Sequence, residues 1–412
     1  MTSKLEDLIA ELCPSGVEYK KIGDIATLVT GGTPKTSYAE YWEGGNIPWM
    51  ASGEVNLGIV SKTDKKITEA GYNSSNTKML PANTVVIALA GQGKTRGKVA
   101  LTKIPLCTNQ SLCGICVDYT VNSKFLYHFL SSKYIELRAI SSGDGTRGGL
   151  NLRIISNFEI PVPPLDVQSE IVRILDTFTE LTAELTAELT AELTARKKQY
   201  EYYRDTLLTF DDNNPLHSLI SHYCPNGVEY KKIKNVYLRI KGTPITASKM
   251  KEIASEDGEV RIFAGGKTVI NAHESDIPKA NITRVPAVLV QSRGVIDAVY
   301  YDKPFTFKNE MWAYASDSQI SVKFLYYSLK NNIQYFRDAA SGMGSLPQIS
   351  LHVTEDFEIP VPPLEVQHQI VQILDRFDAL CNDLTQGLPA EIEARRKQYE
   401  YYRDQLLTFK RA

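Results

Sequence analysis

Several features that would place this 412-residue chain in a common class are scarce or missing. Six cysteines are too few for a disulfide framework in a chain of this length, so a reducing compartment is expected. The longest wholly apolar run, residues 85–90, is far shorter than the ~20 residues that span a bilayer. The first residues lack the basic and apolar segments of a signal peptide. The sequence therefore predicts a soluble, cytoplasmic protein.

Motifs of the common enzyme classes are also missing. We find no HExxH, GxSxG, HRD or DFG motif, no GxGxxG after a predicted strand and no Asn-Pro-Pro-aromatic motif of amino-methyltransferases. Cys113 and Cys116 form a lone CxxC without a second metal-binding pair, which argues against structural zinc. Residues 91–95, GQGKT, resemble a phosphate-binding loop, but Ala88 stands where that loop needs glycine and a strand pattern follows. We therefore expect no catalytic centre, metal or cofactor in this chain.

What the chain does contain is one unit used twice. Residues 13–22, CPSGVEYKKI, return as residues 224–233, CPNGVEYKKI, and the Gly-Thr-Pro at 32–34 returns at 242–244. EIPVPPL at 159–165 returns at 358–364, and KQYEYYRD at 198–205 returns at 397–404, both at an offset of 199. Between these segments, over residues 38–149 and 246–346, no convincing alignment is visible. The concentrated differences suggest two globular parts that do related jobs on different targets.

The repeated segments predict long helices. Pro163-Pro164 suit a helix start, and no glycine or proline interrupts residues 165–210, so we expect one helix of ~46 residues and ~69 Å. Apolar residues recur there at spacings of three and four, as in a coiled-coil seam. Gly387 and Pro389 predict a kink or break in the second helix. The predicted seam consists of Ile171, Phe178, Leu181, Leu185, Leu189 and Leu193, with Ile370, Phe377, Leu380, Leu384, Leu388 and Ile392 in the second helix.

The seams of the two helices match position by position, which favours pairing with each other over a coiled coil with another chain. The predicted fold class is α+β, with two pseudo-symmetric halves, each a mixed α/β domain followed by a long helix. The two helices pair as an antiparallel coiled coil. The predicted parts are a first globular domain at 1–155, a first spacer helix at 156–212, a second globular domain at 213–354 and a second spacer helix at 355–412.

Copies of Thr-Ala-Glu-Leu form a low-complexity array at residues 179–195. Each copy adds ~6 Å and ~40° of rotation to an α-helix, whereas B-DNA advances ~3.4 Å and rotates roughly 35° per base pair. Gaining or losing one copy would re-space two DNA-reading modules by one to two base pairs and roughly keep their angular phase. A plain solvated helix is the alternative interpretation.

The net charge of −2 hides a division of charge along the chain. Residues 20–155 hold 16 basic and 9 acidic residues, and residues 231–354 hold 17 and 11, so both globular parts are basic. Residues 156–212 hold 5 and 12, and residues 355–412 hold 7 and 11, so both helical parts are acidic. Basic, loop-rich modules are typical of phosphate binding, and an acidic helix suits a protein partner.

Polar loops in the two basic parts supply candidate DNA contacts. Glutamine reads adenine and arginine or lysine reads guanine through paired hydrogen bonds, and two strand–loop–strand patterns present such residues at their tips. The candidates are Lys35, Gln92, Lys94, Arg96, Lys98 and Arg147 in the first half, and Lys241, Lys267, Gln291, Ser292 and Arg293 in the second. Ordinary solvated hairpins are the alternative interpretation.

The half-repeat, the IPVPPL entry at residues 160–165 and 359–364, and RKKQYEYYRD at 196–205 together resemble the specificity subunit of a type I restriction–modification system. The resemblance implies a non-catalytic subunit whose two target-recognition domains each read half of a bipartite, asymmetric DNA site, with spacer helices that set the gap. It also implies docking of two methyltransferase (modification) subunits, which carry AdoMet, and of restriction–translocase subunits that use ATP and Mg²⁺.

Two other functions remain open from the residues alone. A coiled-coil scaffold without DNA readout predicts no salt-dependent DNA binding by the chain with its partners. A nucleotide-dependent enzyme that uses residues 91–95 predicts nucleotide binding.

Overall fold

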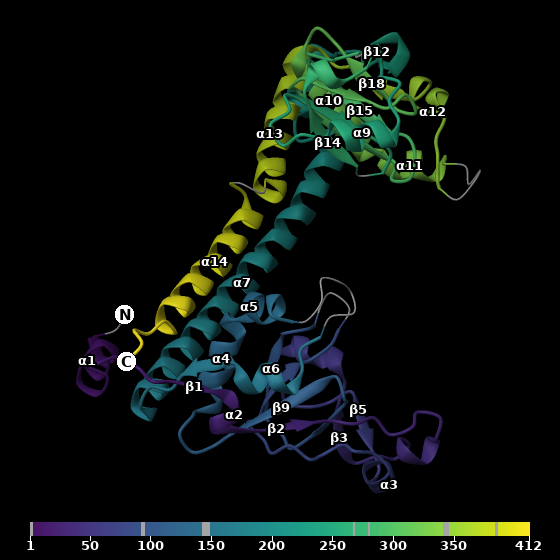
Figure 1. The fold of residues 1–412 in the computed structure, drawn as a ribbon. Helices are drawn as coiled ribbons and strands as arrows, with labels where there is room; N and C mark the ends of the chain where they lie inside the picture. Colours follow the sequence, from purple (N-terminus) through teal and green to yellow (C-terminus); the bar gives the residue numbers. More distant parts are fainter. Residues whose placement is uncertain are drawn as a thin grey trace. The chain divides into compact units, whose positions relative to one another are not determined.

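The computed structural model describes residues 3–91, 95–141, 149–266, 268–278, 281–340, 346–383 and 386–412 (Figure 1). The chain divides into two compact units: unit 1 comprises Met1–Glu188 and Ile392–Ala412, and unit 2 comprises Leu189–Glu391. Among the described residues, no helix combines the length and the hydrophobicity that a membrane crossing requires.

Unit 1 is built on two sheets, whose strands lie in the orders β2-β9-β6-β7-β4 and β5-β3-β8. Their bounds are β2 Ala26–Thr30, β3 Ile47–Met50, β4 Ile59–Val60, β5 Lys65–Ile67, β6 Val85–Ala88, β7 Val99–Thr102, β8 Cys107–Thr108 and β9 Leu112–Val117. Every residue of β6 and β7 is buried, because apolar side chains cover both faces of the sheet there. Val85 and Ile87 pack in the cluster that contains helix residues Phe125 and Leu126, whereas Val86 joins a second cluster on the other face.

The helices of unit 1 surround these sheets. They are α1 Ser3–Leu12, α2 Ile22–Ile25, α3 Glu69–Asn73, α4 Ser123–Ser132, α5 Tyr134–Ala139 and α6 Leu152–Asn157, with the 3-10 helices η1 Ala39–Tyr41 and η2 Ser52–Leu57. The repeated segments that flank the domain pair as two short antiparallel strands, β1 (Tyr19–Lys21) and β10 (Glu159–Pro161). The sequence repeats therefore lie side by side in space, at the point where the chain enters and leaves the domain.

Unit 2 repeats this plan. Its sheets have the orders β12-β18-β15-β16 and β14-β13-β17. The strands are β11 Tyr230–Lys232, β12 Leu238–Lys241, β13 Val260–Phe263, β14 Val269–Ala272, β15 Ala287–Gln291, β16 Asp297–Tyr301, β17 Phe305–Phe307, β18 Trp312–Ala315 and β19 Glu358–Pro360. The helices are α8 His217–Tyr223, η3 Ile233–Asn235, α9 Ala247–Ile253, η4 Glu274–Asp276, α10 Gln319–Asn331, α11 Ile333–Asp338 and α12 Leu351–Glu355.

The two domains share most of their strand order although their middle sequences look unrelated: β2-β9-β6-β7 corresponds to β12-β18-β15-β16, and unit 1 adds β4 at the edge. In unit 1, β3 pairs antiparallel with β5 and parallel with β8, and in unit 2, β13 pairs antiparallel with β14 and parallel with β17. The expectation that the middles do not align is wrong in one segment. Residues 124–127, KFLY on α4, return as residues 323–326, KFLY on α10, at the same offset of 199.

The first long helix, α7 (Leu165–Leu207), has 43 residues and begins directly after Pro164, as predicted. The second is interrupted, as predicted: α13 runs over Leu364–Asn382 and α14 over Leu388–Leu406. Pro389 is the second residue of α14, where its missing N–H costs no helical hydrogen bond. Leu384 lies outside the described residues.

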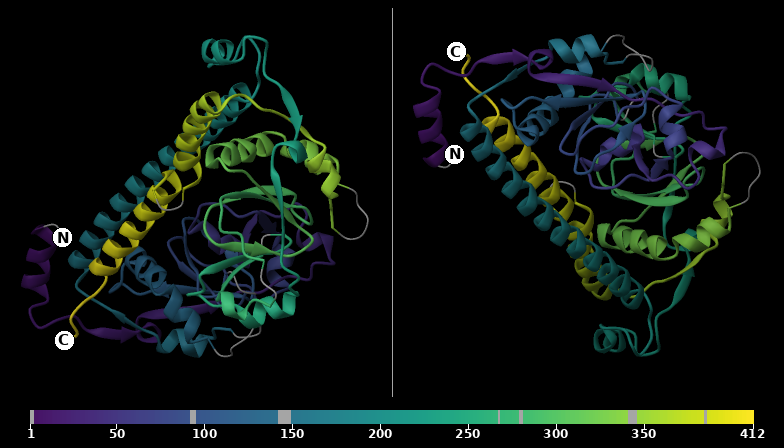
Figure 2. Two further views of the ribbon diagram at one scale, coloured as in Figure 1. Left: turned by 90° about the horizontal axis from the view of Figure 1, so that it is seen from above. Right: turned by 90° about the horizontal axis from the view of Figure 1, so that it is seen from below.

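The long helices contact each other within each unit, and both views in Figure 2 show α14 running beside α7. In unit 1, Phe178 packs on Tyr402 with ring centroids 6.1 Å apart, and the Thr179 and Tyr399 hydroxyls lie 3.0 Å apart, so residue numbers rise on one helix as they fall on the other. This direction confirms antiparallel pairing there. In unit 2, Tyr203 of α7 stacks on Phe377 of α13 at 5.2 Å.

The predicted seam is only partly closed. Ile171 and Ile370 are fully buried in clusters that also contain the end of the other long helix, Leu406 in the cluster of Ile171 and Leu207 in that of Ile370. Leu181 is 57% exposed and Leu380 is 36% exposed, so a two-helix pair leaves part of each apolar stripe uncovered. The remaining described seam residues, Leu185, Leu189, Leu193, Leu388 and Ile392, are half-buried.

A buried glutamine ties the start of each long helix to its domain. The Gln168 amide accepts from Asn122 N at 2.8 Å and donates to the carbonyls of Thr120 and Pro163 at 3.0 and 2.7 Å. At the equivalent position of α13, Gln367 donates to Pro362 O at 2.7 Å, and its Oε1 atom is buried without a partner among the described residues.

This difference predicts that truncating Gln168 and truncating Gln367 lower the free energy of unfolding by unequal amounts. We expect Gln168→Ala to lower the free energy of unfolding by about 2–3 kcal/mol and Gln367→Ala by about 1 kcal/mol, since each lost hydrogen bond is worth about 1 kcal/mol. Hydrogen exchange on α4 and α10 can measure both values, because the two units need not unfold together. Equal losses of unfolding free energy in the two variants would contradict the assignment of three hydrogen bonds to Gln168 and one to Gln367.

A buried carboxylate anchors α1 to α7 in unit 1. Glu170 is almost fully buried and binds Arg173 at 2.6 Å and Lys4 at 2.9 Å. Hydrogen bonds from Arg173 and Lys4 lower the pKa of Glu170 to about 2. Unit 2 carries Gln369 at the equivalent position of α13.

This contact predicts a pH dependence. The pKa of Glu170 is lower in the folded chain than in the unfolded one, so its contribution to stability is complete above pH ~4.5 and disappears as the pH falls toward 2. Glu170→Gln, which copies the unit 2 residue, should therefore reduce the loss of thermal stability of unit 1 between pH 5 and pH 2. An unchanged acid profile would show that this carboxylate is not coupled to folding.

Candidate DNA interface

The Gly-Thr-Pro loop of unit 1 follows β2 and holds Lys35. The backbone crosses β8 so closely that a Cβ at Gly31 would lie 2.0 Å from Thr108 O, and Gly32 N donates to that carbonyl at 2.9 Å. Lys35 is exposed, with its ammonium 5.6 Å above the Tyr38 ring. Lys35 therefore lies on the surface, on a loop whose backbone is held by its close contact with β8.

The second Gly-Thr-Pro loop is fixed in the same way. A Cβ at Gly242 would lie 2.2 Å from Phe307 O, and the Thr243 hydroxyl bonds the Thr306 hydroxyl at 2.7 Å. Lys241 is exposed at the end of the edge strand β12, and its carbonyl accepts from Asn281 Nδ2. Both copies of the repeat thus place a lysine beside a close crossing of backbone.

The strand–loop–strand interpretation of the GQGKT segment is confirmed, because β6 and β7 pair antiparallel and a strand follows the loop. Arg96 and Lys98 are half-buried, and Lys98 Nζ donates to Asn56 Oδ1 at 2.7 Å. The other predicted contacts at the tips of these loops, Gln92, Lys94, Arg147 and Lys267, lie outside the described residues.

The second predicted hairpin is also present, since β15 and β16 pair antiparallel. Arg293, between them, is exposed. Gln291 is nearly buried, and Ser292 is fully buried with its hydroxyl donating to Glu310 O. Because both side chains are buried, neither presents a surface to DNA in this structure.

A second lysine lies near Lys35 and was not predicted from the sequence. Lys65, on the edge strand β5, places its ammonium 5.7 Å above the ring of Trp42, whose Nε1 atom donates to Lys35 O. Neither lysine forms an ion pair with a carboxylate in the described part of the chain. Two adjacent lysines on a three-residue strand give too weak a signal to mark such a surface.

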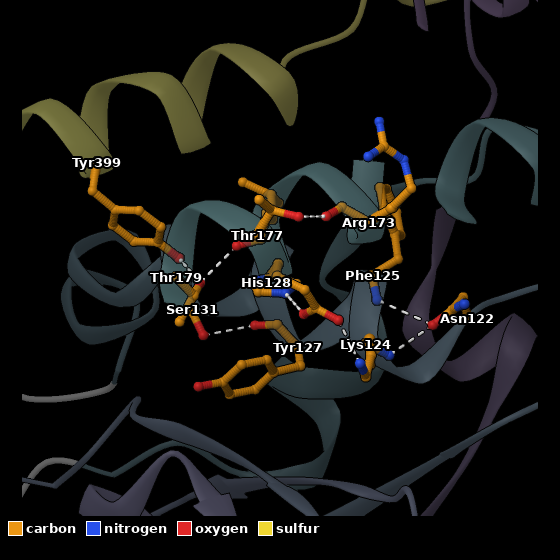
Figure 3. Close-up of polar contacts among 12 residues, drawn as sticks. Asn122, Lys124, Phe125, Tyr127, His128, Ser131, Arg173, Thr177, Thr179 and Tyr399 are labelled. Atoms are coloured by element: carbon orange, nitrogen blue, oxygen red, sulfur yellow. Dashed lines mark hydrogen bonds and ion pairs between the residues drawn. The ribbon is translucent and has the colours of Figure 1, made fainter. Parts of the chain in front are cut away.

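A polar cluster joins α4 to α7 in unit 1, and Figure 3 shows Lys124 and His128 directed toward α7. Asp176 of α7 binds Lys124 Nζ and lies 3.2 Å from His128 Nε2. Burial lowers the pKa of His128, so its neutral ring donates Nε2–H to the carboxylate. Burial opposes ionisation of Asp176, but the bonds from Lys124 and His128 outweigh it and lower its pKa.

Unit 2 repeats this cluster at the offset of 199. Asp375 of α13 binds Lys323 and accepts a hydrogen bond from the Tyr327 hydroxyl at 2.6 Å. Burial and the neighbouring carboxylate raise the pKa of Tyr327, so the hydroxyl remains protonated and donates. We name these two groups the unit 1 junction (Lys124, His128, Asp176) and the unit 2 junction (Lys323, Tyr327, Asp375). The KFLY repeat is the signal that would have revealed them from sequence.

In the parts of the chain with assigned structure, no three His, Cys, Asp or Glu side chains are grouped so that they could hold a metal ion.

Comparisons with known proteins agree on one family. The family model of the type I restriction modification DNA specificity domain matches residues 14–195 and 225–394. The specificity subunit of EcoR124I/EcoR124II from Escherichia coli is 34% identical over 315 residues, which cover 71% of this chain and 72% of that protein. The EcoprrI specificity subunit, also from Escherichia coli, is 28% identical over 389 residues, 90% of each chain.

Solved structures agree on the fold. The S subunit of M. genitalium aligns over 95% of this chain and 96% of its own, with a TM-score of 0.51 and 18% identity. A chain from a study of complex assembly and conformational transition in a type I R-M system aligns over 96% and 98%, with a TM-score of 0.63 and 17% identity.

Two mixed-sheet domains with basic loops, each followed by a long helix, define a modular DNA-recognition protein. The chain belongs to the type I restriction–modification DNA specificity family, and is a specificity subunit. It is not itself an enzyme, because catalysis in these systems lies in the modification and restriction subunits.

Two exposed candidate contacts, Lys35 and Arg293, allow a test of the predicted DNA interface. Lys35→Ala and Arg293→Ala should each weaken DNA binding by the assembled complex and reduce the salt slope of log K by about one, if each contacts one phosphate. Lys231→Ala is the matched control, because Glu229 already neutralises that lysine at 2.9 Å. Binding measured from 50 to 200 mM salt separates these variants. A Lys231 effect as large as the others would indicate a general loss of positive charge.

Proposed function

We propose that each unit reads one half of a bipartite, asymmetric DNA site. In this proposal, residues 1–155 and 213–354 are the target-recognition domains. Their shared topology, positive charge and different loops support two readers with different sequences. The proposed contacts are Lys35, Arg96, Lys98, Lys241 and Arg293, together with Gln92, Lys94, Arg147 and Lys267.

We propose that residues 156–212 and 355–412 form the spacer that sets the gap between the half-sites. The observation that carries this proposal is the uninterrupted α7, which contains the whole Thr-Ala-Glu-Leu array without a glycine or proline. A continuous helix converts inserted residues into a fixed translation and rotation, which a flexible linker does not.

We further propose that the spacer docks two methyltransferase subunits. The acidic helical segments and the half-open seam support a protein partner on these helices. AdoMet would bind in those partners, and ATP with Mg²⁺ in the restriction–translocase subunits. Membership of the family favours this function over a scaffold without DNA readout. The strand after residues 91–95 argues against a nucleotide-dependent enzyme.

Deleting one copy of the array, residues 186–189, tests the spacer. The methylated site should keep both half-site sequences and lose one to two base pairs from its gap, because the deletion removes ~6 Å and ~40° from α7. Methylation mapping of DNA from cells that carry the system measures the gap directly.

Glu188→Ala is the control for this deletion, since it changes an exposed residue of the same copy and keeps the helix length. Its gap should equal that of the wild type. Changed half-site sequences, or an unchanged gap after the deletion, would refute the spacer role.

A further inference from the structure

We propose that Asp176 and Asp375 are positioning residues, which fix each target-recognition domain on its spacer helix and thereby determine how strictly the gap is enforced. This inference rests on the proposed spacer function. Neither residue touches DNA in the proposal; both act through the orientation of the domain that does.

The two junctions occupy equivalent places in their units. Lys124 and His128 are one helical turn apart on α4, and both bind a single carboxylate of α7. Lys323 and Tyr327 have the same spacing on α10 and bind the equivalent carboxylate of α13. A shift of either helix by one turn, ~5.4 Å, would break both bonds at once.

Each junction is a polar, partly exposed group beside an apolar helix contact. Around Asp176, the two helices pack through Phe125, Leu126, Ile171 and Leu175, which are all fully buried. Apolar packing tolerates small shifts and rotations, whereas hydrogen bonds to a carboxylate are directional. Both ion pairs are partly exposed, so they add little to stability and contribute mainly their directional geometry to the helix contact.

The two junctions differ in the side chains around the shared bond. His128 in unit 1 and Tyr327 in unit 2 differ in size and chemistry, yet both donate a hydrogen bond to the carboxylate. The neighbouring Phe129 and Ser131 of α4 correspond to Ser328 and Lys330 of α10. The feature that the two units share is therefore the donor–carboxylate bond and not the surrounding side chains.

A mechanical consequence follows from this bond. When a DNA site has a gap one base pair too long or too short, the DNA, the spacer or the junction must deform by ~3.4 Å and roughly 35°. A rigid junction raises the free energy of the complex on DNA with the wrong gap. A weakened junction lets the domain rotate relative to its spacer helix. Loosening should therefore relax the gap while leaving base readout within each half-site unchanged.

Matched variants isolate the hydrogen bond. Tyr327→Phe removes only the hydroxyl that binds Asp375. In unit 1, His128→Tyr installs the unit 2 residue, and His128→Phe installs the same ring without the hydroxyl. An open cavity of about 390 Å³, lined by Lys124, His128 and Asp176 among others, leaves room for the larger ring.

Tyr237→Phe is the control for loss of a buried hydroxyl elsewhere in the same domain. The Tyr237 hydroxyl donates to Ser321 O at 2.9 Å within the domain, and it does not bridge to α13. Thermal unfolding of Tyr237→Phe and Tyr327→Phe is measured in parallel, and a loss of gap preference in Tyr327→Phe that Tyr237→Phe does not show at a comparable loss of stability cannot arise from stability alone.

The experiment measures methylation by the full complex with its modification subunits. The substrates carry the wild-type gap, a gap one base pair shorter or longer, or a single changed base in one half-site. Tyr327→Phe and His128→Phe should reduce the preference for the correct gap by about tenfold, because each loses a hydrogen bond to a charged group. His128→Tyr and Tyr237→Phe should keep the preference, and all four should keep half-site discrimination.

Three results would overturn the proposal. Unchanged gap preference in Tyr327→Phe and His128→Phe would show that the junction bonds do not set it. Parallel loss of gap preference and half-site discrimination would reveal a merely structural role. A wild-type complex that methylates substrates with all gap lengths equally would refute the spacer function itself. Because this outcome is measured on the wild type alone, it is distinct from a failure of the junction variants.

Discussion

The structure of each unit depends on the burial of the first turns of a long helix in the core of the domain before it. Ile171 and Ile370 are fully buried there, so the helix is part of the domain and not an appendage. The buried glutamine and the junction carboxylate on the same turns then fix how the helix enters and how it is rotated. Without this shared core, a long helix could not transmit a defined position to the loops of the domain.

The division of charge follows the same plan. Basic residues gather in the two domains and acidic residues in the two helices, so a net charge of −2 conceals surfaces suited to opposite kinds of partner. Not every basic residue serves a ligand: Lys124 and Lys323 are used inside the junctions, and Lys4 and Arg173 hold a buried carboxylate. A count of charges along the sequence therefore overstates the number of cations that are available to a ligand.

Much of the architecture was predictable because it rests on local patterns. The proline start of α7, the break near Gly387 and the hairpins at β6–β7 and β15–β16 each follow from short stretches of sequence. Individual side chains were less predictable. Ser292 looked like a loop residue but is buried beneath Glu310, and Leu181 looked like a seam residue but is exposed, because burial depends on what a distant segment places against each position.

The sequence by itself determined the duplication, the helical spacer, the charge division and, through the repeated motifs, the family. These features are encoded in periodicity, composition and repetition, which need no knowledge of distant contacts. Only the tertiary structure decided that the two divergent middles share most of their strand order, and that Asp176 and Asp375 each receive two donors from a neighbouring helix. The physical reason is that the contacts of a four-residue match such as KFLY depend on which carboxylate, some fifty residues away, folding places against it.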